Sequence, residues 1–381
     1  MSDADPSCPS PAGIPDMVRD VMPPAATRPP GAAVQPGRRD RRAGRRPTRD
    51  DVAELAGVSS AVVSYVVNEG PRPVSEAARQ RVLDAIRSLG YIPNQAARSL
   101  AGQRTRTLGL IAPTLANPVW SGLALGVNDV ALPESFLPMV CDVEGDADLD
   151  LHYAETLASK QVDGVIIVPS AEPADTLGIL VRASVPAVVV ERSTSLAPSV
   201  VVDAEATGRL VTQHLLDLGH RRIAFLREHG SSLDSRHRLL GYRAALSEAG
   251  LTPDDRFVLD TGLSRHGSIV EGARSAAEEI FELDPPPTAV FAHNDLIAIA
   301  VVRAARRRGW RVPDDVSVIG VDDIEAGRYV EPPLTTMPFP SRELGRVAAR
   351  TLLTMIAGGA PPRSTVIPPS RLVVRASTAP R

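Results

Sequence analysis

The residues best suited to chemistry near the start of this sequence are arginines. Six of them fall within nine positions: Arg38, Arg39, Arg41, Arg42, Arg45 and Arg46. Guanidinium groups at this density contact phosphate oxygens without reading a base sequence. Residues 38–106 hold 14 Arg against 7 Asp and Glu, although the whole chain has a net charge of −3. A basic segment on an acidic chain indicates a polyanionic partner for that segment alone, with a solvated basic tail as the alternative.

The residue types that carry catalysis and metal binding lack the spacings that those functions need. The 7 His are scattered, and Cys8 and Cys141 stand outside any metal-ligand spacing. No G-x-G-x-x-G follows an expected strand, and we find no phosphate-binding loop and no G-x-S-x-G nucleophile motif. We therefore expect no catalytic residues, no bound metal and no cofactor.

Composition and the N-terminal residues bear on the compartment. No apolar run approaches the ~18 residues that a membrane-spanning helix needs. The first residues carry acids and prolines without the apolar stretch of a secretory signal. Two cysteines exclude a disulfide framework. These features predict a cytoplasmic protein that does not enter a membrane.

The elements that must position any site begin after a segment without periodicity. Residues 1–46 are rich in Pro, Ala and Arg, and we expect them to be disordered. Residues 47–93 then predict three short helices with a Gly-containing turn between the first two, which is the plan of a helix-turn-helix domain. Another small three-helix module is the alternative. The helix starts are marked by Thr48 with Asp51, by Ser59 and by Ser75.

The apolar spacing defines one face of each predicted helix. The first helix places Val52, Leu55 and Ala56 on one face, and Gly57 ends it. The second and third helices carry further apolar residues at helical spacing: Val62, Val63, Val66, Val67, Ala78, Val82, Leu83, Ile86 and Leu89.

From residue 105 the pattern changes to short apolar runs that alternate with amphipathic helices. This order predicts parallel sheets arranged as two similar lobes with a cleft between them, and ligands of such sheets bind beyond the C-terminal strand ends. The eight expected strands are Leu108–Ala112, Met139–Cys141, Gly164–Val168, Ala187–Val190, Ile223–Leu226, Phe257–Leu259, Ala289–Ala292 and Val316–Val321.

Ordered motifs along residues 46–375 resemble the lactose-repressor/galactose-repressor family. The head matches it in DVAELAGVSSAVVSYVVN and RVLDAIRSLGYIPNQAARSL. The larger region matches it in VDGVIIVP, HLLDLGHRRIAFL, AHNDLIAIA, VPDDVSVIGVDD and PPLTTM. The resemblance implies an all-α helix-turn-helix head followed by an α/β, two-lobed, periplasmic-binding-protein-like effector domain over residues 105–381. It also implies a hinge helix and linker over residues 94–104.

The resemblance assigns the DNA contacts to the head and the hinge. The second helix becomes the recognition helix in the major groove. Two departures alter its contacts, because many members carry Arg at Tyr65 and a long polar residue at Ala61. Leu100 matches the residue that wedges into the minor groove, and packing on its dimer mate is the alternative. The expected DNA-binding residues are Thr48, Ser59, Ser60, Ala61, Ser64, Tyr65, Asn68, Asn94 and Leu100.

The resemblance also places a small-molecule effector between the lobes. Amide, carboxyl, guanidinium and aromatic groups suit a sugar-like, polyhydroxylated ligand. Arg238 shows no acidic partner in the sequence, which favours a ligand role. The other candidates have structural alternatives: Asn294 or Asp295 can cap a helix, Asp322 can be a turn residue and Trp120 can be a core residue. Thr114, Val119 and Glu191 depart from the family pattern and point away from a familiar hexose. The expected effector-binding residues are Asn117, Trp120, Glu191, Arg238, Asn294 and Asp322.

Taken together, these features predict a homodimeric transcriptional repressor. Two heads read a pseudo-palindromic operator, and a ligand changes operator affinity by altering the spacing of the hinge segments. The sequence contains none of the catalytic motifs considered above, which argues against an enzyme. The helix-turn-helix head argues against a periplasmic sugar-binding protein. A nucleoid protein that binds DNA without sequence preference is the third alternative.

Overall fold

The computed structural model describes residues 45–67, 72–92, 104–228, 233–261 and 269–381. The chain divides into two compact units, one ending at Pro93 and the other beginning at Asn94. The disorder expected for residues 1–46 lies outside the described residues as far as residue 44, and residues 45–46 have no regular secondary structure. No helix in the described part of the chain is long and apolar enough to cross a membrane.

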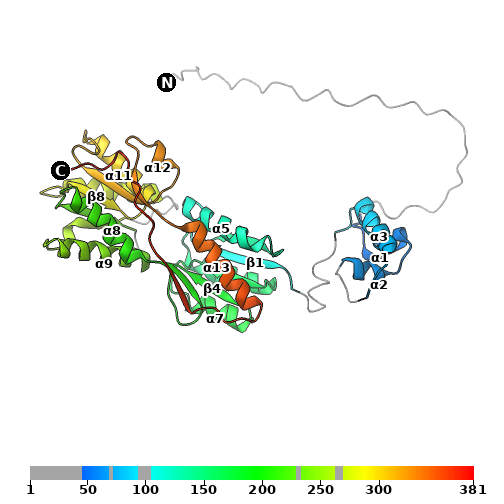
Figure 1. Cartoon of the computed structure of the whole chain (residues 1–381). Coiled ribbons are helices and arrows are strands. Elements are labelled where there is room, and N and C mark those ends of the chain that lie inside the picture. Colours follow the sequence, from blue (N-terminus) through cyan, green and yellow to red (C-terminus); the bar gives the residue numbers. More distant parts are fainter. Residues whose placement is uncertain (1–44, 68–71, 93–103, 229–232, 262–268) are drawn as a thin grey trace, which may run out of the picture. The chain divides into compact units, whose positions relative to one another are not determined.

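The first unit contains the helices α1 (Arg49–Ala56), α2 (Ser60–Val67) and α3 (Glu76–Leu89) (Figure 1). A capping box starts α1 as expected. The Thr48 backbone N–H donates to the Asp51 carboxylate at 2.7 Å, and the Asp51 N–H donates back to the Thr48 hydroxyl at 3.4 Å. The start of the first helix is therefore encoded by two residues that satisfy each other's polar groups.

The three helices enclose one apolar cluster: Val52, Ala53, Ala56, Val63, Val66, Val82 and Ala85. Gly57 ends α1 in the left-handed conformation, with a φ of 63°. The Arg81 guanidinium donates to the carbonyl of Ala56 at 3.1 Å and so ties α3 to the end of α1. The apolar face predicted for α1 was wrong in one residue, because Leu55 is 55% exposed and Ala53 takes its place in the core.

The second unit has two lobes, and the first is built on a parallel sheet in the order β11-β5-β4-β3-β1-β2. The helices α5 and α13 cover one face of this sheet, and α6 and α7 cover the other. The strands are β1 (Thr107–Ala112), β2 (Leu137–Asp142), β3 (Gly164–Ile167), β4 (Ala187–Val190), β5 (Ser199–Val202) and β11 (Ser364–Ile367). The helices are α5 (Pro118–Ala131), α6 (Ala147–Ser159), α7 (Ala174–Arg182) and α13 (Ser341–Ile356).

The second lobe repeats this plan with a parallel sheet in the order β10-β9-β8-β6-β7. The helices α8 and α9 pack on one face, and α10 and α11 pack on the other. The strands are β6 (Ile223–Arg227), β7 (Val258–Asp260), β8 (Ala289–Ala292), β9 (Ser317–Asp322) and β10 (Thr335–Pro338). The helices are α8 (Ala204–Asp217), α9 (Leu233–Glu248), α10 (Ile269–Glu279), α11 (Asp295–Arg307) and the short α12 (Ala326–Tyr329), with 3₁₀ turns η1 (Asp255–Phe257) and η2 (Ile280–Glu282).

The chain passes between the lobes at three points. It leaves the first lobe between β5 and α8, returns between β10 and α13, and leaves again after β11. The last segment, red in Figure 1, ends on the second lobe, where Val373 pairs with Thr336 and the Ser377 hydroxyl donates to the Val318 carbonyl. Each lobe therefore depends on both early and late parts of the chain.

Glycines let the paired helices of each lobe approach closely. A Cβ on Gly126 of α5 would lie 2.0 Å from the Arg342 carbonyl oxygen of α13, and a Cβ on Gly241 of α9 would lie 2.0 Å from the Glu205 carbonyl oxygen of α8. No side chain fits at such distances, so the two helix pairs require glycine at their crossings.

The expected two-lobed parallel α/β fold is confirmed, but three strands of it were not predicted. Each of β5, β10 and β11 has four residues. Two of the three lie at sheet edges, and β10 begins with two Thr and ends with Pro. Short edge strands need little apolar surface, so β10 and β11 lack the apolar run used to predict the others. The interior strand β5 does contain such a run, Val200–Val202, and was overlooked.

Candidate functional site

The surface of the head that was predicted to read DNA lies on α2. Val63 and Val66 of this helix are buried, and Ser59 and Ala61 are exposed. Ser64 and Tyr65 are half-buried, and Tyr65 lies outside the apolar cluster. The side of α2 that is not in the core is therefore uncharged and presents hydroxyl, methyl and phenol groups.

Several expected contact residues already have polar partners in the head, and Ser59 accepts the Val62 N–H at 3.4 Å. The Ser60 hydroxyl donates to the Asp50 carboxylate at 2.6 Å and so links α2 to α1. The Thr48 hydroxyl donates to the Asp51 carboxylate at 2.7 Å. These bonds fix the start of each helix, whose N-terminal N–H groups favour anions. The remaining expected contacts, Asn68, Asn94 and Leu100, lie outside the described residues.

Four of the six predicted effector residues meet where the two lobes face each other. From the first lobe come Asn117, which caps α5, and Glu191, which directly follows β4. From the second come Arg238 of α9 and Asp322, the last residue of β9. The Asn117 amide hydrogen-bonds the Asp322 carboxyl, and the Arg238 charge acts on both Glu191 and Asp322.

Backbone strain marks the two carboxyl residues at the strand ends. Glu191 has a φ of 63° and Asp322 a φ of 126°, which side-chain-bearing residues rarely adopt. Such conformations cost of order 1–3 kcal/mol and concentrate at functional sites. The equivalent position of both residues, each immediately at the end of a parallel strand, agrees with the rule for ligand sites in open α/β sheets.

Arg238 has partners that the sequence analysis did not find. It lies within α9 and is 3% exposed, and its guanidinium pairs with Asp234, one turn earlier, at 2.8 Å. It also donates to the backbone carbonyl of His293. The argument that Arg238 lacks an acidic partner was therefore wrong, because a spacing of four residues brings both charges to one helix face. Its Nε has no partner among the described residues.

Further ionisable groups complete this cluster. The His293 Nε2 lies 3.3 Å from the Glu228 carboxylate and 3.7 Å from the Asp234 carboxylate. Burial raises the pKa of Glu228, but the hydrogen bond and charge of His293 and the charge of Arg238 outweigh burial and lower it overall. The cluster therefore contains an acid paired with Arg238 and an acid that contacts His293, beside the two carboxyls at the strand ends.

The two strand-end carboxyls are in a different electrostatic state. Burial, and then the charge of Asp234, raises the pKa of Glu191 to about 8, although its carboxylate accepts the Val202 N–H at 3.0 Å. Burial, and then the charge of Asp295, raises the pKa of Asp322 well above its usual range. Glu191 therefore holds a proton near neutral pH and can donate a hydrogen bond as well as accept one, and the pKa of Asp322 is shifted in the same direction.

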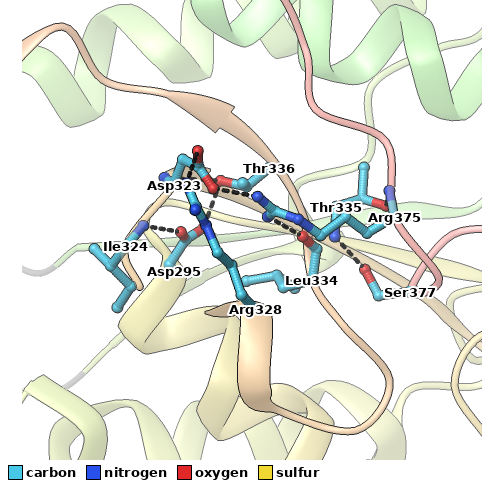
Figure 2. A network of polar contacts seen from close by, with 9 residues as sticks. All are labelled: Asp295, Asp323, Ile324, Arg328, Leu334, Thr335, Thr336, Arg375 and Ser377. Carbon is cyan, nitrogen blue, oxygen red and sulfur yellow. Dashed lines mark hydrogen bonds and ion pairs between the residues drawn. The ribbon is translucent and has the colours of Figure 1, made fainter. Parts of the chain in front are cut away.

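Of the two helix caps that the sequence offered for α11, Asn294 is the cap and Asp295 is not. The Asn294 side chain accepts the Ile297 N–H at 2.9 Å and caps α11, whereas Asp295 is the first residue of the helix and is fully buried. Asp295 accepts the Ile324 N–H at 2.9 Å and the Thr336 hydroxyl at 2.6 Å (Figure 2). The cap prediction for Asp295 was thus wrong, and Asn294 has an assigned structural role.

Figure 2 shows how this network holds the end of β9. Asp323, directly after Asp322, pairs with Arg328 at 3.1 Å and with Arg375 of the last segment. Arg375 also donates to the Leu334 carbonyl at 2.7 Å. The C-terminal segment therefore fixes the backbone from which Asp322 projects.

Trp120 lies at the margin of the site. It packs on the apolar core of the first lobe, with its ring 6.4 Å from that of Phe339 in an edge-to-face arrangement. The Phe339 N–H donates to the Asp322 carbonyl, which connects this aromatic pair to the strand end. Both the core role and the ligand role considered for Trp120 are compatible with this position.

Sequence reasoning missed four residues of the site: Glu228, Asp234, His293 and Phe339. Asp234 could have been found from its helical spacing to Arg238, and His293 precedes Asn294 in the motif AHND. Glu228 and Phe339 carry no local signal. No group of three or more His, Cys, Asp or Glu in the described part of the chain has a geometry suited to a metal ion.

Known proteins resemble both parts of the chain. Residues 48–94 match the bacterial regulatory proteins of the lacI family, and residues 212–378 match the periplasmic binding protein-like domain. The HTH-type transcriptional regulator DegA of Bacillus subtilis is 34% identical over 335 residues, which are 87% of this chain and 97% of DegA. The HTH-type transcriptional repressor PurR of Photobacterium profundum is 35% identical over 312 residues, which are 81% of this chain and 92% of PurR.

Solved structures give the same result. The lac repressor dimer bound to operator and the anti-inducer ONPF is 31% identical, with a TM-score of 0.78, and the match covers 88% of this chain and all of that one. The complex of the transcriptional regulator CelR with cellobiose is 33% identical, with a TM-score of 0.65 over 87% of this chain and all of that one. With a matching head, a matching large domain and relatives covered over nearly their whole length, this chain belongs to the lacI family of bacterial transcription regulators.

Proposed function

We propose that this chain is a homodimeric repressor that binds a pseudo-palindromic operator and changes its operator affinity when a small polyhydroxylated molecule binds between its lobes. The observation that carries the proposal is the meeting of Asn117 and Glu191 with Arg238 and Asp322 across the lobe boundary. A ligand that bonds to both sets favours one arrangement of the lobes over another and so acts through its differential affinity.

The DNA-binding role rests on the head. Its α2 has a buried apolar side and an uncharged polar side, so the exposed groups can reach base edges while the basic residues of the head contact phosphates. Ser59, Ser60, Ala61, Ser64 and Tyr65 are the residues that we assign to this surface. DNA as the target also supports the cytoplasm as the compartment.

The homodimer is supported by an apolar surface on the first lobe. β2 is an edge strand of its sheet, and the neighbouring α5 adds to the same side. Exposed apolar side chains of these elements and of the residue after α5 are Leu125, Leu132, Leu137, Met139 and Val140. Exposed apolar side chains on an edge strand are typical of a protein interface, and a two-fold dimer matches a two-fold operator.

Selection of bound fragments from the source genome by the purified full chain tests the function. The selection is run near physiological salt, where non-specific binding is weak. We expect a short palindrome to be enriched and its affinity to change when a metabolite that stabilises the large unit is added. Equal binding of selected and random DNA would instead identify a non-specific DNA-binding protein. A turnover of the bound metabolite would contradict our proposal that the site binds its ligand without chemistry.

A further inference from the structure

The site between the lobes has more acidic groups than its basic groups neutralise. Asp234 is paired with Arg238, and Glu228 is paired with His293. Glu191 and Asp322 remain, and the hydrogen bonds found for them come from uncharged donors, the Val202 N–H and the Asn117 amide. Buried carboxyls without a cationic partner are costly in their charged form, and a cation bound beside them would lower that cost.

Three buried polar atoms of this cluster have no hydrogen-bond partner in the described part of the chain. One is a donor, the Nε of Arg238, whose side chain is almost completely buried. Two are acceptors, an oxygen of Asp234 and an oxygen of Asp322. Buried polar atoms are normally satisfied, so a ligand that completes this site must offer one acceptor and at least two donors.

The pattern of missing partners distinguishes between ligand groups. A hydroxyl has one donor and can serve one of the two carboxyl oxygens, whereas a protonated amine has three donors and no acceptor. An amine also brings a positive charge, which would let Glu191 and Asp322 ionise without leaving a buried charge unpaired. Hydrogen bonds between charged groups are about twice as strong as those between neutral groups.

We propose that the effector, if bound at this site as the proposed function requires, carries a protonated amine that is held by Asp234, Asp322 and Glu191, beside a hydroxyl or ring oxygen that accepts from the Nε of Arg238. Amino sugars and amino-deoxy polyols combine these groups in one small molecule. The neutral sugar of the same shape brings no charge and makes only neutral hydrogen bonds to these acids, so it binds more weakly.

Matched pairs of small molecules test this inference on the full chain. Glucose, galactose, mannose and sorbitol are compared with glucosamine, galactosamine, mannosamine and glucamine by calorimetric titration. We expect at least one amine to bind about tenfold more tightly than its neutral partner, because a charged hydrogen bond exceeds a neutral one by roughly that factor. N-acetylation of that amine, which removes the charge and keeps the ring, should abolish the preference.

Charge-removing variants locate the amine. Asp234→Asn and Asp322→Asn should each reduce the ratio of amine to neutral affinity to near one, whereas Glu282→Gln, which removes an exposed acid paired with Arg308 on the second lobe, should leave the ratio unchanged. The inference would be overturned by tighter binding of the neutral sugars and polyols, by no binding of any amine, or by a preference for the amine that survives both variants. Each of these results leaves operator recognition intact, whereas failure of the proposed function removes the enriched palindrome itself.

Discussion

The two binding surfaces of this chain differ in where their polar groups lie. On α2 of the head the hydroxyl and phenol groups are exposed or half-buried and uncharged, and the Ser60 hydroxyl already donates to Asp50 when no DNA is bound. At the lobe site the polar groups include carboxyls, an arginine and a histidine, and three of their atoms are buried without a partner among the residues that the structure describes. Each unsatisfied buried atom costs about 1–3 kcal/mol. The head is therefore complete without its ligand, whereas the lobe site is not.

The largest effect that sharpens this comparison should come from Arg238→Leu. Removing the guanidinium leaves the Asp234 carboxylate buried without its cation, which should lower the free energy of unfolding by about 3–5 kcal/mol. Urea unfolding followed by tryptophan fluorescence measures this, since Trp120 and Trp310 are the two tryptophans and both lie in the large unit.

Two matched variants separate charge from packing at this position. Arg308→Leu removes a more exposed arginine, which pairs with Glu282, and should cost less than about 1 kcal/mol. The double variant Arg238→Leu with Asp234→Leu should recover most of the lost stability, because no unpaired charge remains. A double variant as unstable as Arg238→Leu alone would show that packing, and not the buried charge, dominates the site.

The next effect concerns Asp295, the first residue of α11, whose carboxylate accepts the Ile324 N–H just after β9. Burial raises its pKa to about 7, with the charge of Asp323 adding to the shift and the bonds from Thr336 and Ile324 opposing it. The folded chain therefore holds a proton that the unfolded chain, with an ordinary pKa of 3.8, releases. Its contribution to stability is complete below the unfolded pKa and is lost as the pH rises through about 7.

Comparison with Asp295→Asn isolates this contribution. An amide mimics the protonated carboxyl, so wild type should lose on the order of 3 kcal/mol relative to the variant between about pH 4 and about pH 8. Asp315→Asn is the control of opposite sign, because Arg311 lowers the pKa of that carboxyl and its contribution is lost as the pH falls. A constant difference between wild type and Asp295→Asn across this range would mean that Asp295 is ionised in the fold.

A smaller effect is expected on the head, where two tyrosines differ in their contact with the apolar cluster. Tyr65 lies outside the apolar cluster, whereas Tyr91 packs against it. Tyr65→Ala should weaken binding to the selected operator by about 1–2 kcal/mol, roughly 5- to 30-fold, and leave hydrogen exchange of the head unchanged. Tyr91→Ala should accelerate exchange throughout the head. Faster exchange in Tyr65→Ala would assign that ring to the fold instead.

The contrast between the surfaces also explains what the sequence could predict. The head depends on neighbours in the chain, so the spacing of Thr48 and Asp51 and the position of Gly57 were enough to predict its helix starts and first turn. Buried strands such as β3 and β4, which have only apolar residues apart from one Gly, were predicted for the same reason.

The lobe site depends on residues far apart in the chain and was predicted less well. The motif resemblance supplied Asn117, Glu191, Arg238 and Asp322, which do come together. It gave neither the charge balance, which arises from contacts such as Glu228 with His293, nor the packing of Phe339 on Trp120. Those contacts are set by sheet order and by the return of the chain between the lobes, which local spacing does not encode.

The smallest effect tests whether the head surface depends on its own capping residues. Thr48 was expected to contact phosphate, but its hydroxyl is already bonded to Asp51 at 2.7 Å. Thr48→Ala should therefore cost about 1 kcal/mol of helix stability, seen as faster hydrogen exchange in residues 49–56, while Thr48→Ser keeps the cap. Its effect on DNA should be equal for operator and random sequences, because a cap orders the helix N-terminus and reads no base. A loss of affinity confined to the operator would instead make Thr48 part of the base-reading surface. The head, like the lobe site, would then contain a polar group that needs its ligand as a partner.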